Sequence, residues 1–339
     1  MRVDDVVHAV SSVGDCPDRW GSGEIVGPPG LENTMRVGTV RRGATATAVV
    51  VAVDEHTAAV VPGYQDVAET LADQGHGDTV ARARARGERV LLAEVRWAPP
   101  IRRPGKVLCV ALNNSANPQR ILSGPRTPAM FTKPSSSLIG HGEEIRLRDD
   151  YGRVHPEPEL AVVIGTGGSD IGVPEAWSHV FGYTILNDLT SPTMRAEDTF
   201  HYRAVHPDPH DPAAARHVES WVSYPARYKG TDTFGPIGPW VVTADEVPDP
   251  HTLRIRCRHN GLVVTDDTTA NLRFGVAEVI SFASRYLALE PGDVIAMGTA
   301  LRPSAEGGAV QNVDLTRLGG TVEVEIDGIG LLANPVVLR

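Results

Sequence analysis

The stretch His155-Pro156-Glu157-Pro158-Glu159-Leu160-Ala161-Val162-Val163-Ile164-Gly165 joins two glutamates to a run of apolar residues. Alanine, valine and isoleucine in such a run predict a buried strand. Glu157 and Glu159 are two residues apart, so both side chains point to one face of that strand, about 7 Å apart at their Cα atoms. Two like charges at the entry to a core repel each other and lose hydration. A divalent cation would resolve that conflict.

A second apolar segment, Tyr183–Leu186, is followed directly by Asn187 and Asp188. Asp188 would add a third carboxylate, and three carboxylates leave half of an octahedral metal shell free for water and substrate. The alternative is a charged strand end whose glutamates are solvated. We therefore predict a site for a divalent cation at Glu157, Glu159 and Asp188.

The composition excludes several classes of protein. Of the 339 residues, 41% are hydrophobic and 22% charged, as in ordinary globular proteins. The formal net charge of −10 disfavours nucleic acid or an anionic membrane as a partner, and no apolar run reaches the roughly 18 residues of a membrane span. The first residues lack a secretory hydrophobic region. Cys16, Cys109 and Cys257 are too widely spaced for a disulfide framework or a zinc knuckle. We expect a soluble, cytoplasmic protein.

Changes in composition along the chain predict three parts. Residues 1–34 are rich in Gly, Pro, Asp and Ser and are expected to be loosely structured. Residues 35–100 hold short valine-rich strands and a helical stretch, Asp66 to Arg86 with a break near Gly75, which predicts a small α+β domain. A proline-rich joint ends that domain, and residues 101–339 form the third and largest part.

Strands punctuated by Gly and Pro dominate the third part. With one clear helix at Val276–Leu287, they predict a β-rich sandwich or roll. Asn260-Gly261 marks a hairpin, because this pair accepts the positive φ angles of a type I′ turn. The expected strands are Lys106–Leu112, Ala129–Thr132, Glu144–Leu147, Glu159–Ile164, His179–Leu186, Trp240–Thr243, Leu253–His259, Leu262–Val264, Val294–Met297, Val322–Ile326 and Gly330–Val337.

Six separated motifs in this part resemble the fumarylacetoacetate hydrolase family, in the family's order and spacing. They are Phe131-Thr132-Lys133-Pro134, the strand from Glu157 to Gly165, Gly182-Tyr183-Thr184-x-x-Asn187-Asp188, Lys229-Gly230-x-Asp232-Thr233-Phe234-x-Pro236-x-Gly238-Pro239, Asn260-Gly261 and Pro291-Gly292-Asp293-Val294-Ile295-x-x-Gly298-Thr299. The resemblance implies a mixed β-sandwich roll, which makes the fold class a β-rich α+β, with the small α+β domain in front of it. It also implies a homodimer.

The same resemblance implies a chemistry and a set of site residues. Family members hold Mg²⁺, Mn²⁺ or Ca²⁺ on the carboxylates that match Glu157, Glu159 and Asp188, and they act on small 2-oxo or 2,4-dioxo acids. Lys229 matches a lysine whose charge stabilises a developing enolate, and we count Lys229 and Asp188 as catalytic. Thr299 matches a threonine that binds the substrate carboxylate. Lys133, from the first motif, is assigned to substrate binding.

Two departures from the family pattern affect the site. Hydrolytic members carry a histidine, held by a glutamate, that activates water, and here Asn117 and Arg120 stand in those places. An amide cannot take a proton at neutral pH, and a guanidinium is never a base there, so we assign Asn117 to substrate binding. Pro192 replaces a family arginine that meets substrate acid groups. Arg195, one helical turn further, is expected to supply that cation; the alternative is a surface arginine.

The connection from Arg195 to Lys229 is longer than in the family's short members. A loop of this length is often a lid or a partner contact. It carries His201 and His206, and His201 is assigned to the substrate site as a replacement for the lost base; the alternative for each is a surface or structural role. Asp314, in the C-terminal part, could approach the same pocket.

Three functions remain open at this point. The favoured one is a metal-dependent hydrolase that cleaves a C–C bond in a 2,4-dioxo acid of the acylpyruvate or fumarylacetoacetate kind. A lyase that dehydrates a 2-oxo-3-deoxy sugar acid or decarboxylates an oxo-acid is the alternative, because these reactions need no activated water. A non-catalytic metal-binding relative is the third, and the joint retention of the three carboxylates and Lys229 speaks against it.

Overall fold

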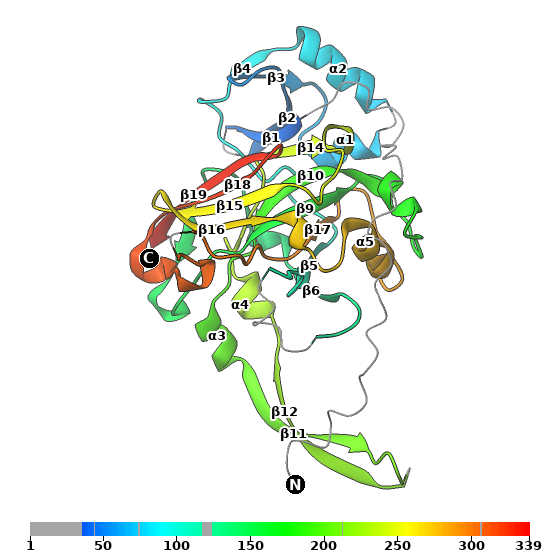
Figure 1. The fold of residues 1–339 in the computed structure, drawn as a ribbon. Coiled ribbons are helices and arrows are strands. Elements are labelled where there is room, and N and C mark those ends of the chain that lie inside the picture. The colour runs from blue at the N-terminus through cyan, green and yellow to red at the C-terminus, as the bar shows by residue number, and fades with distance from the viewer. Residues whose placement is uncertain (1–35, 44, 74, 117–123, 212, 306) are drawn as a thin grey trace.

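The computed structural model describes residues 36–339, except residues 44, 74, 117–123, 212 and 306. The segment predicted to be loosely structured, 1–34, therefore lies outside the described residues. Figure 1 shows the first four strands and two helices at one end of the molecule, a body of packed sheets in the middle and a long two-stranded ribbon at the other end. Within the described residues, no helix is long and apolar enough to span a membrane.

A ten-stranded sheet forms the larger layer, in the order β4-β3-β2-β1-β14-β10-β9-β17-β5-β6. Pairing of β1 with β14 carries this sheet without a break from residues 36–91 into the body. The division into domains at residue 100 stays a prediction. The strands are β1 (Arg36–Arg42), β2 (Ala46–Ala52), β3 (Thr57–Val61), β4 (Arg89–Leu91), β5 (Val107–Ala111), β6 (Ala129–Lys133), β9 (Pro158–Ile164), β10 (Val180–Asn187), β14 (Trp240–Thr243) and β17 (Val294–Ala296).

A five-stranded sheet packs on one face of the first, in the order β16-β15-β18-β19-β8. All seven residues of β9 are buried. Leu160, Val162 and Ile164 lie in the core shared with the second sheet, whereas Ala161 and Val163 lie in the core on the opposite face. Burial of each larger aliphatic side chain stabilises the fold by about 1.5–3 kcal/mol. The strands are β8 (Ile145–Leu147), β15 (Arg254–His259), β16 (Leu262–Thr268), β18 (Gly320–Ile326) and β19 (Gly330–Leu338).

Helices and short elements complete the fold. The helical stretch expected from Asp66 to Arg86 is two helices, broken before Gly75 as predicted, and the helix expected to reach Leu287 ends at Ser284. The elements are α1 (Val67–Ala72), α2 (His76–Arg86), α3 (Pro192–Glu197), α4 (Ala226–Gly230), α5 (Val276–Ser284), α6 (Leu315–Leu318), β7 (Leu138–Ile139) and β13 (Gly235–Pro236), with short 3₁₀ turns between them.

The long connection between Arg195 and Lys229 is not the loop that the sequence suggested. It forms β11 (Thr199–Pro207) and β12 (Ala215–Ser223), a two-stranded antiparallel ribbon between α3 and α4. Prolines and histidines in this segment obscure its strands, but apolar residues alternate at 200, 202 and 204. α3 is a helix, as the assignment of Arg195 required.

Candidate metal centre and active site

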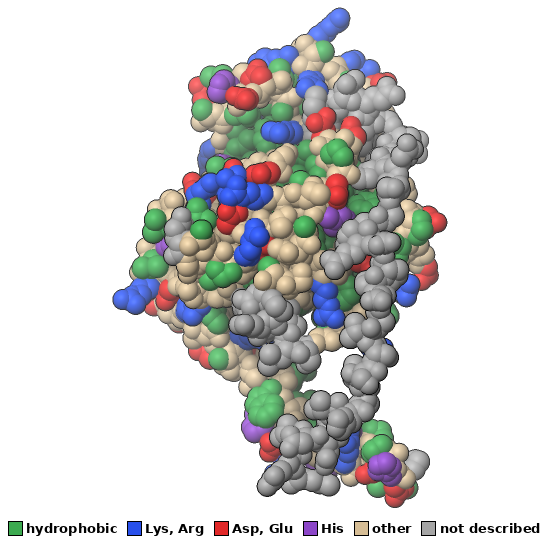
Figure 2. Space-filling view, in the orientation of Figure 1, with side chains coloured by type: hydrophobic (Ala, Val, Ile, Leu, Met, Phe, Trp, Pro, Cys, Tyr) green, Lys and Arg blue, Asp and Glu red, His purple; other side chains and the backbone are tan. Residues whose placement is uncertain are grey.

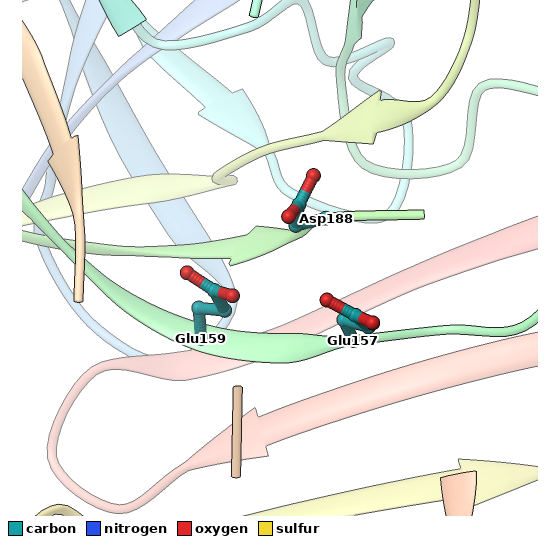
Figure 3. Close-up of side chains that lie close together, drawn as sticks. All are labelled: Glu157, Glu159 and Asp188. Atoms are coloured by element: carbon teal, nitrogen blue, oxygen red, sulfur yellow. The ribbon is translucent and has the colours of Figure 1, made fainter. Parts of the chain in front are cut away.

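Antiparallel pairing of β9 and β10 brings the three predicted carboxylates together. Leu186 pairs with Glu159, so the chain just beyond β10 lies beside the start of β9. The backbone N–H of Asp188 donates to the Glu157 carbonyl at 2.9 Å, and the Asn187 side chain accepts from the Glu157 N–H at 2.9 Å. One carboxylate oxygen from each of the three residues lies within 4.8 Å of the others. Figure 3 shows the three side chains on these neighbouring strand ends.

Two lysines and a threonine bind the same carboxylates. The Lys229 ammonium donates to Glu157 Oε2 at 2.7 Å and to Asp188. The Lys133 ammonium donates to Asp188 Oδ1 at 2.7 Å and to the Lys229 carbonyl. The Thr299 hydroxyl lies 2.9 Å from Glu157 Oε2 and 3.1 Å from Glu159 Oε1. With every group ionised, three carboxylates against two ammonium groups leave one negative charge in excess.

Burial and neighbouring charges shift the pKa values of this cluster in opposite directions. Burial raises the pKa of Glu159 well above its ordinary value, and the Asp188 carboxylate raises it further. Burial also acts to raise the pKa of Glu157, but Lys229 overcomes this and the pKa falls to about 2. Burial acts to lower the pKa of Lys229, and the carboxylates around it raise the pKa above its ordinary value instead.

The cluster fits a divalent cation by its charge and its ligand type. Its oxygens are hard ligands of the kind that Mg²⁺, Mn²⁺ and Ca²⁺ prefer, and the excess charge is negative. Glu157 Oε1 receives no hydrogen bond from the described residues, and His155 Nε2 lies 3.8 Å from it. The side chains of Glu159 and Asp188 are almost fully buried, so a cation here would be shielded from bulk water on the protein side.

The cluster opens into a cavity of about 440 Å³. Its lining combines charged and polar side chains with apolar residues of β5, β6 and the neighbouring loops. The lining residues are Val110, Ala111, Leu112, Ala129, Met130, Phe131, Arg153, His155, Glu157, Glu159, Asp188, Thr190, Pro192, Arg195, Pro225, Tyr228, Lys229, Thr299, Leu301 and Gln311.

Not every predicted site residue lies on this cavity. Thr299, Arg195 and Lys229 line it, as expected for groups that meet a substrate. Lys133 does not: its fully buried ammonium sits behind Asp188, so it supports a carboxylate and has no direct access to a substrate. Asn117 and Arg120 lie outside the described residues.

The ribbon histidines also lie away from the cavity. The His201 ring stacks on Trp221 with ring centroids 4.4 Å apart, and more than half of the His201 side chain is exposed. His201 therefore does not replace the missing base in this arrangement, and His206 lies further along the same ribbon. The Asp314 side chain caps α6 by accepting from the Arg317 N–H, and its neighbour Gln311 reaches the cavity instead.

Sequence reasoning missed two cavity residues, His155 and Arg153. His155 Nδ1 lies 3.1 Å from the Pro156 carbonyl, which can only accept, so Nδ1 carries the proton and Nε2 faces Glu157. Burial lowers the pKa of His155, which keeps the ring neutral. Its position two residues before Glu157 predicts the same face of the chain, and that signal was available. Arg153 had no comparable pattern in the sequence.

Residues 106–337 match the model of the fumarylacetoacetate (FAA) hydrolase C-terminal domain. The chain belongs to the fumarylacetoacetate hydrolase family. Over 239 residues it is 33% identical to a protein of Xenopus laevis named as a mitochondrial oxaloacetate tautomerase, which covers 70% of this chain and 67% of that protein. The family's enzymes thus include tautomerases as well as hydrolases.

Solved structures agree with this membership and with the β-rich fold. Maleylpyruvate hydrolase from Sphingobium sp. SYK-6, in complex with manganese(II) and pyruvate, has a TM-score of 0.67 and 25% identity over 90% of this chain and 99% of that one. A 5-carboxymethyl-2-hydroxymuconate delta-isomerase from Mycobacterium smegmatis has a TM-score of 0.64 and 29% identity over the same shares. The predicted fold class, a mixed sandwich roll of this family, is confirmed.

Proposed function

We propose that the chain is a divalent-metal-dependent enzyme that forms the enolate of a small 2-oxo acid and transfers a proton to or from it. Keto–enol tautomerisation of a 2-oxo dicarboxylic acid is the reaction that this proposal favours. The observation that carries it is that Lys229 and three carboxylates lie together on the wall of a cavity of about 440 Å³. The tautomerase activity named for the Xenopus relative supports the choice.

Glu157, Glu159 and Asp188 would hold the cation, with Mg²⁺ the expected ion and Mn²⁺ or Ca²⁺ the alternatives. A bound divalent cation supplies Lewis acidity toward the 2-oxo acid end of the substrate. The Lys229 ammonium lies beside the Glu157 and Asp188 carboxylates and 5.1 Å from the centre of the Phe131 ring, and its charge would stabilise a developing enolate. His155 also lines the cavity, with Nε2 toward Glu157. We assign to His155 Nε2 the role of the base that accepts the proton from the carbon beside the carbonyl.

Two arginines are suited to a second acid group on the substrate. Arg153 and Arg195 line the cavity, and neither guanidinium makes an ion pair with a described residue. A guanidinium binds a carboxylate with two parallel hydrogen bonds. A dicarboxylic acid would thus bind with its 2-oxo acid end at the metal, beside Thr299, and with its second carboxylate at these arginines.

Hydrolysis of a C–C bond in a 2,4-dioxo acid is the second candidate. The likeness to maleylpyruvate hydrolase supports it. This reaction needs a water activated by a base, and the family dyad is replaced by Asn117 and Arg120, whose placement is not described. The lyase reactions are a further candidate, because they do not depend on a water activated by a base. We also expect a homodimer in the cytoplasm, with no nucleic acid or membrane partner.

Incubation of the Mg²⁺-loaded protein with three panels of acids tests the proposal. The panels are oxaloacetate, acylpyruvates and 2-oxo-3-deoxy sugar acids, with products followed by mass and by the ultraviolet absorbance of the enol. A faster enol-to-keto conversion without change of mass supports tautomerisation. Gain of water with chain cleavage supports the hydrolase, and loss of water or CO₂ supports the lyase. No change in any panel would overturn the proposal.

Variants of the two arginines separate substrate recognition from chemistry. Arg153→Gln and Arg195→Gln should raise KM for a dicarboxylic oxo acid by roughly tenfold, because a charge-assisted contact is lost. KM for a monocarboxylic oxo acid should change little, which provides the control. An equal effect on both substrates would contradict the assignment of these arginines to the distal acid group.

A further inference from the structure

Each glutamate of the candidate metal centre has one oxygen that protein donors hold firmly. Glu159 Oε2 accepts the backbone N–H of Gly298 at 2.9 Å in a buried position. Glu157 Oε2 accepts from the Lys229 ammonium at 2.7 Å, and the Thr299 hydroxyl lies 2.9 Å from it. Glu157 Oε1 receives no hydrogen bond from the described residues, and Glu159 Oε1 meets the Thr299 hydroxyl at a longer 3.1 Å. Each glutamate therefore presents mainly one oxygen, Oε1, to a cation.

Asp188 has a lysine on each oxygen, and the two lysines differ in their freedom to move. Lys229 donates to Oδ2 and also lines the cavity, so its ammonium has space to leave that oxygen. Lys133, at the end of β6, donates to Oδ1 at 2.7 Å, and its side chain is 0% exposed. Movement of Lys133 would leave a buried ammonium without its acceptors, which is costly. Oδ1 is thus the Asp188 oxygen that stays bound to the protein.

We propose that Lys133 is a positioning residue that limits Asp188 to one-oxygen ligation of the cation and thereby favours Mg²⁺ over Ca²⁺. This inference rests on the cation site proposed above. Ca²⁺ takes roughly six to eight oxygens and often uses both oxygens of one carboxylate, whereas Mg²⁺ demands octahedral geometry. To bind with both oxygens, a carboxylate must turn both toward the cation. Asp188 Oδ1 is turned toward a buried ammonium, whose charge also repels a cation at that oxygen.

The same ammonium links Asp188 to the backbone of Lys229. Lys133 Nζ donates to the Lys229 carbonyl in α4 as well as to Asp188. One side chain of β6 therefore fixes the carboxylate that follows β10 relative to the helix that carries Lys229. Lys133 acts through these two residues and not on the substrate, since it does not line the cavity. Indirect partners of this kind contribute about 10–100-fold to metal affinity.

The charge of Lys133 affects every divalent cation, so a ratio of two affinities isolates its positioning effect. Lys133→Met keeps an unbranched apolar side chain and removes the ammonium. With every group ionised, three carboxylates against the one remaining ammonium leave two negative charges in excess. That change attracts Mg²⁺ and Ca²⁺ alike, because both carry two positive charges. Release of Asp188 Oδ1 for ligation favours Ca²⁺ alone.

Lys106 provides a matched control in the same fold. Its ammonium lies 2.8 Å from the fully buried Asp293 carboxylate, which makes a second lysine–aspartate pair with a buried partner. Neither residue belongs to the cluster of three carboxylates. Lys106→Met thus removes one positive charge from the chain without touching Asp188. On the face that Figure 2 shows, acidic side chains are interspersed with Lys and Arg side chains, so weak binding of cations to the surface would be common to both variants.

Calorimetric titration of the metal-free full chain with Mg²⁺ and with Ca²⁺ tests the proposal. In Lys133→Met, the ratio of the Mg²⁺ affinity to the Ca²⁺ affinity should fall roughly tenfold below that of wild type. Lys106→Met should keep the wild-type ratio. An unchanged ratio in Lys133→Met would overturn the role of Lys133 and leave the cation site standing. Absence of cation binding by wild type would overturn both.

A second measurement needs no variant and serves if circular dichroism shows that Lys133→Met does not fold. It is a crystal structure of wild type grown with Ca²⁺, the ion that most readily takes both oxygens of a carboxylate. Asp188 should coordinate Ca²⁺ through Oδ2 alone, with Lys133 Nζ still bound to Oδ1. Coordination through both Asp188 oxygens would overturn the proposal.

Discussion

The carboxylate of Asp267 is fully buried, and protein donors satisfy both of its oxygens. The donors, at 2.6–3.0 Å, are the backbone N–H groups of Thr268, Leu301 and Arg302 and the side-chain amides of Asn114 and Asn271. Leu301 lines the candidate cavity, and Asn114 lies in the loop that follows β5. Asp267 thus joins two chain segments at the edge of the site without touching the cavity itself.

Replacement of Asp267 by alanine should destabilise the protein strongly. The change leaves five N–H donors without their acceptor in a buried region, so we expect the free energy of unfolding to fall by roughly 3 kcal/mol or more. Denaturant unfolding measures this difference. Asp327→Ala removes a half-exposed carboxylate paired with Arg256 and should change it by less than about 1 kcal/mol. If Asp267→Ala lowered the free energy of unfolding as little as this control does, the Asp267 carboxylate would not be the shared acceptor of these five donors.

His251 provides a pH dependence whose sign follows from its contacts. Its Nε2 accepts from the Val276 N–H at 3.1 Å, and its Nδ1 lies 3.2 Å from Asp249. Burial lowers the pKa of His251 below 6.5, against the opposing effects of Asp249 and Glu278. The unfolded chain therefore takes up a proton first as the pH falls. The stability due to neutral His251 is fully present above about pH 6.5, the pKa of the unfolded chain, and is lost as the pH falls from there through the lower pKa of the folded state.

The measurement compares wild type with His251→Gln, in which the amide oxygen can still accept from Val276. Titrating groups other than His251 act equally in both proteins, so the difference in unfolding free energy isolates this residue. The free energy of unfolding of wild type should exceed that of His251→Gln by the most near pH 7.5, and this difference should be smaller at about pH 5. A difference that grows on acidification would show that His251 is protonated in the folded state.

Residue patterns predicted part of the site. The i, i+2 spacing of Glu157 and Glu159 placed both on one face, and the structure brings Asp188 to them. The hydrogen bonds of Lys133 could not be predicted from the sequence. A lysine in a strand gives the same sequence pattern whether its ammonium binds a substrate or a buried carboxylate of the protein. His201 illustrates the opposite error: a histidine in an unassigned segment invites a catalytic role, and only three-dimensional placement removes it.

At the scale of elements, β10 depends on a glycine for its packing. Pairing with β9 shifts register between Val180 and Gly182, and Gly182 also pairs with Thr243 of β14. A Cβ at Gly182 would lie 2.2 Å from the Val242 carbonyl oxygen. Backbone atoms cannot move aside as the tip of a side chain can. β10 thus approaches β14 too closely for any larger residue, and the proposed metal ligand Asp188 directly follows the end of β10 at Asn187.

Gly182→Ala should therefore lower the free energy of unfolding by roughly 1–3 kcal/mol or more, because the strands must separate to admit the methyl group. Denaturant unfolding again provides the number. Gly75→Ala is the matched control, since its nearest contact is the Asp73 side chain at 3.4 Å and its φ of −90° suits alanine. If both variants were equally stable, the tight β10–β14 contact would not exist in solution.

The main error in predicting secondary structure was the segment of β11 and β12, where residues typical of turns outweighed the strand pattern. Alternating apolar residues were present in β11, but Pro207, Pro209 and Pro212 made the segment read as a loop. Pro207 is the last residue of β11 and Pro209 follows the strand, positions where a sheet tolerates proline. The strands of the body were easier to predict, because unbroken runs of valine and isoleucine carry a strong signal on their own.

At the scale of the whole molecule, fold class was predictable and strand order was not. Dense strands with few helices indicated a β-rich sandwich, and the six motifs indicated its family. Pairing of Arg36–Arg42 with Trp240–Thr243 joins segments far apart in the sequence, and no local pattern encodes such a contact. The continuous ten-stranded sheet, and with it the close link between the N-terminal strands and the body, therefore required the structure.

Calorimetric titration with Mg²⁺ and with Mn²⁺ measures whether Glu157, Glu159 and Asp188 hold a divalent cation. Wild type should bind one cation per chain. Glu159→Gln keeps the size of the side chain but removes its charge, and affinity should fall by roughly 100-fold or more, since even indirect partners of a metal contribute 10–100-fold. Glu94→Gln, at an exposed residue outside the site, should bind as wild type does. Unchanged affinity in Glu159→Gln, or no binding by wild type, would contradict the account.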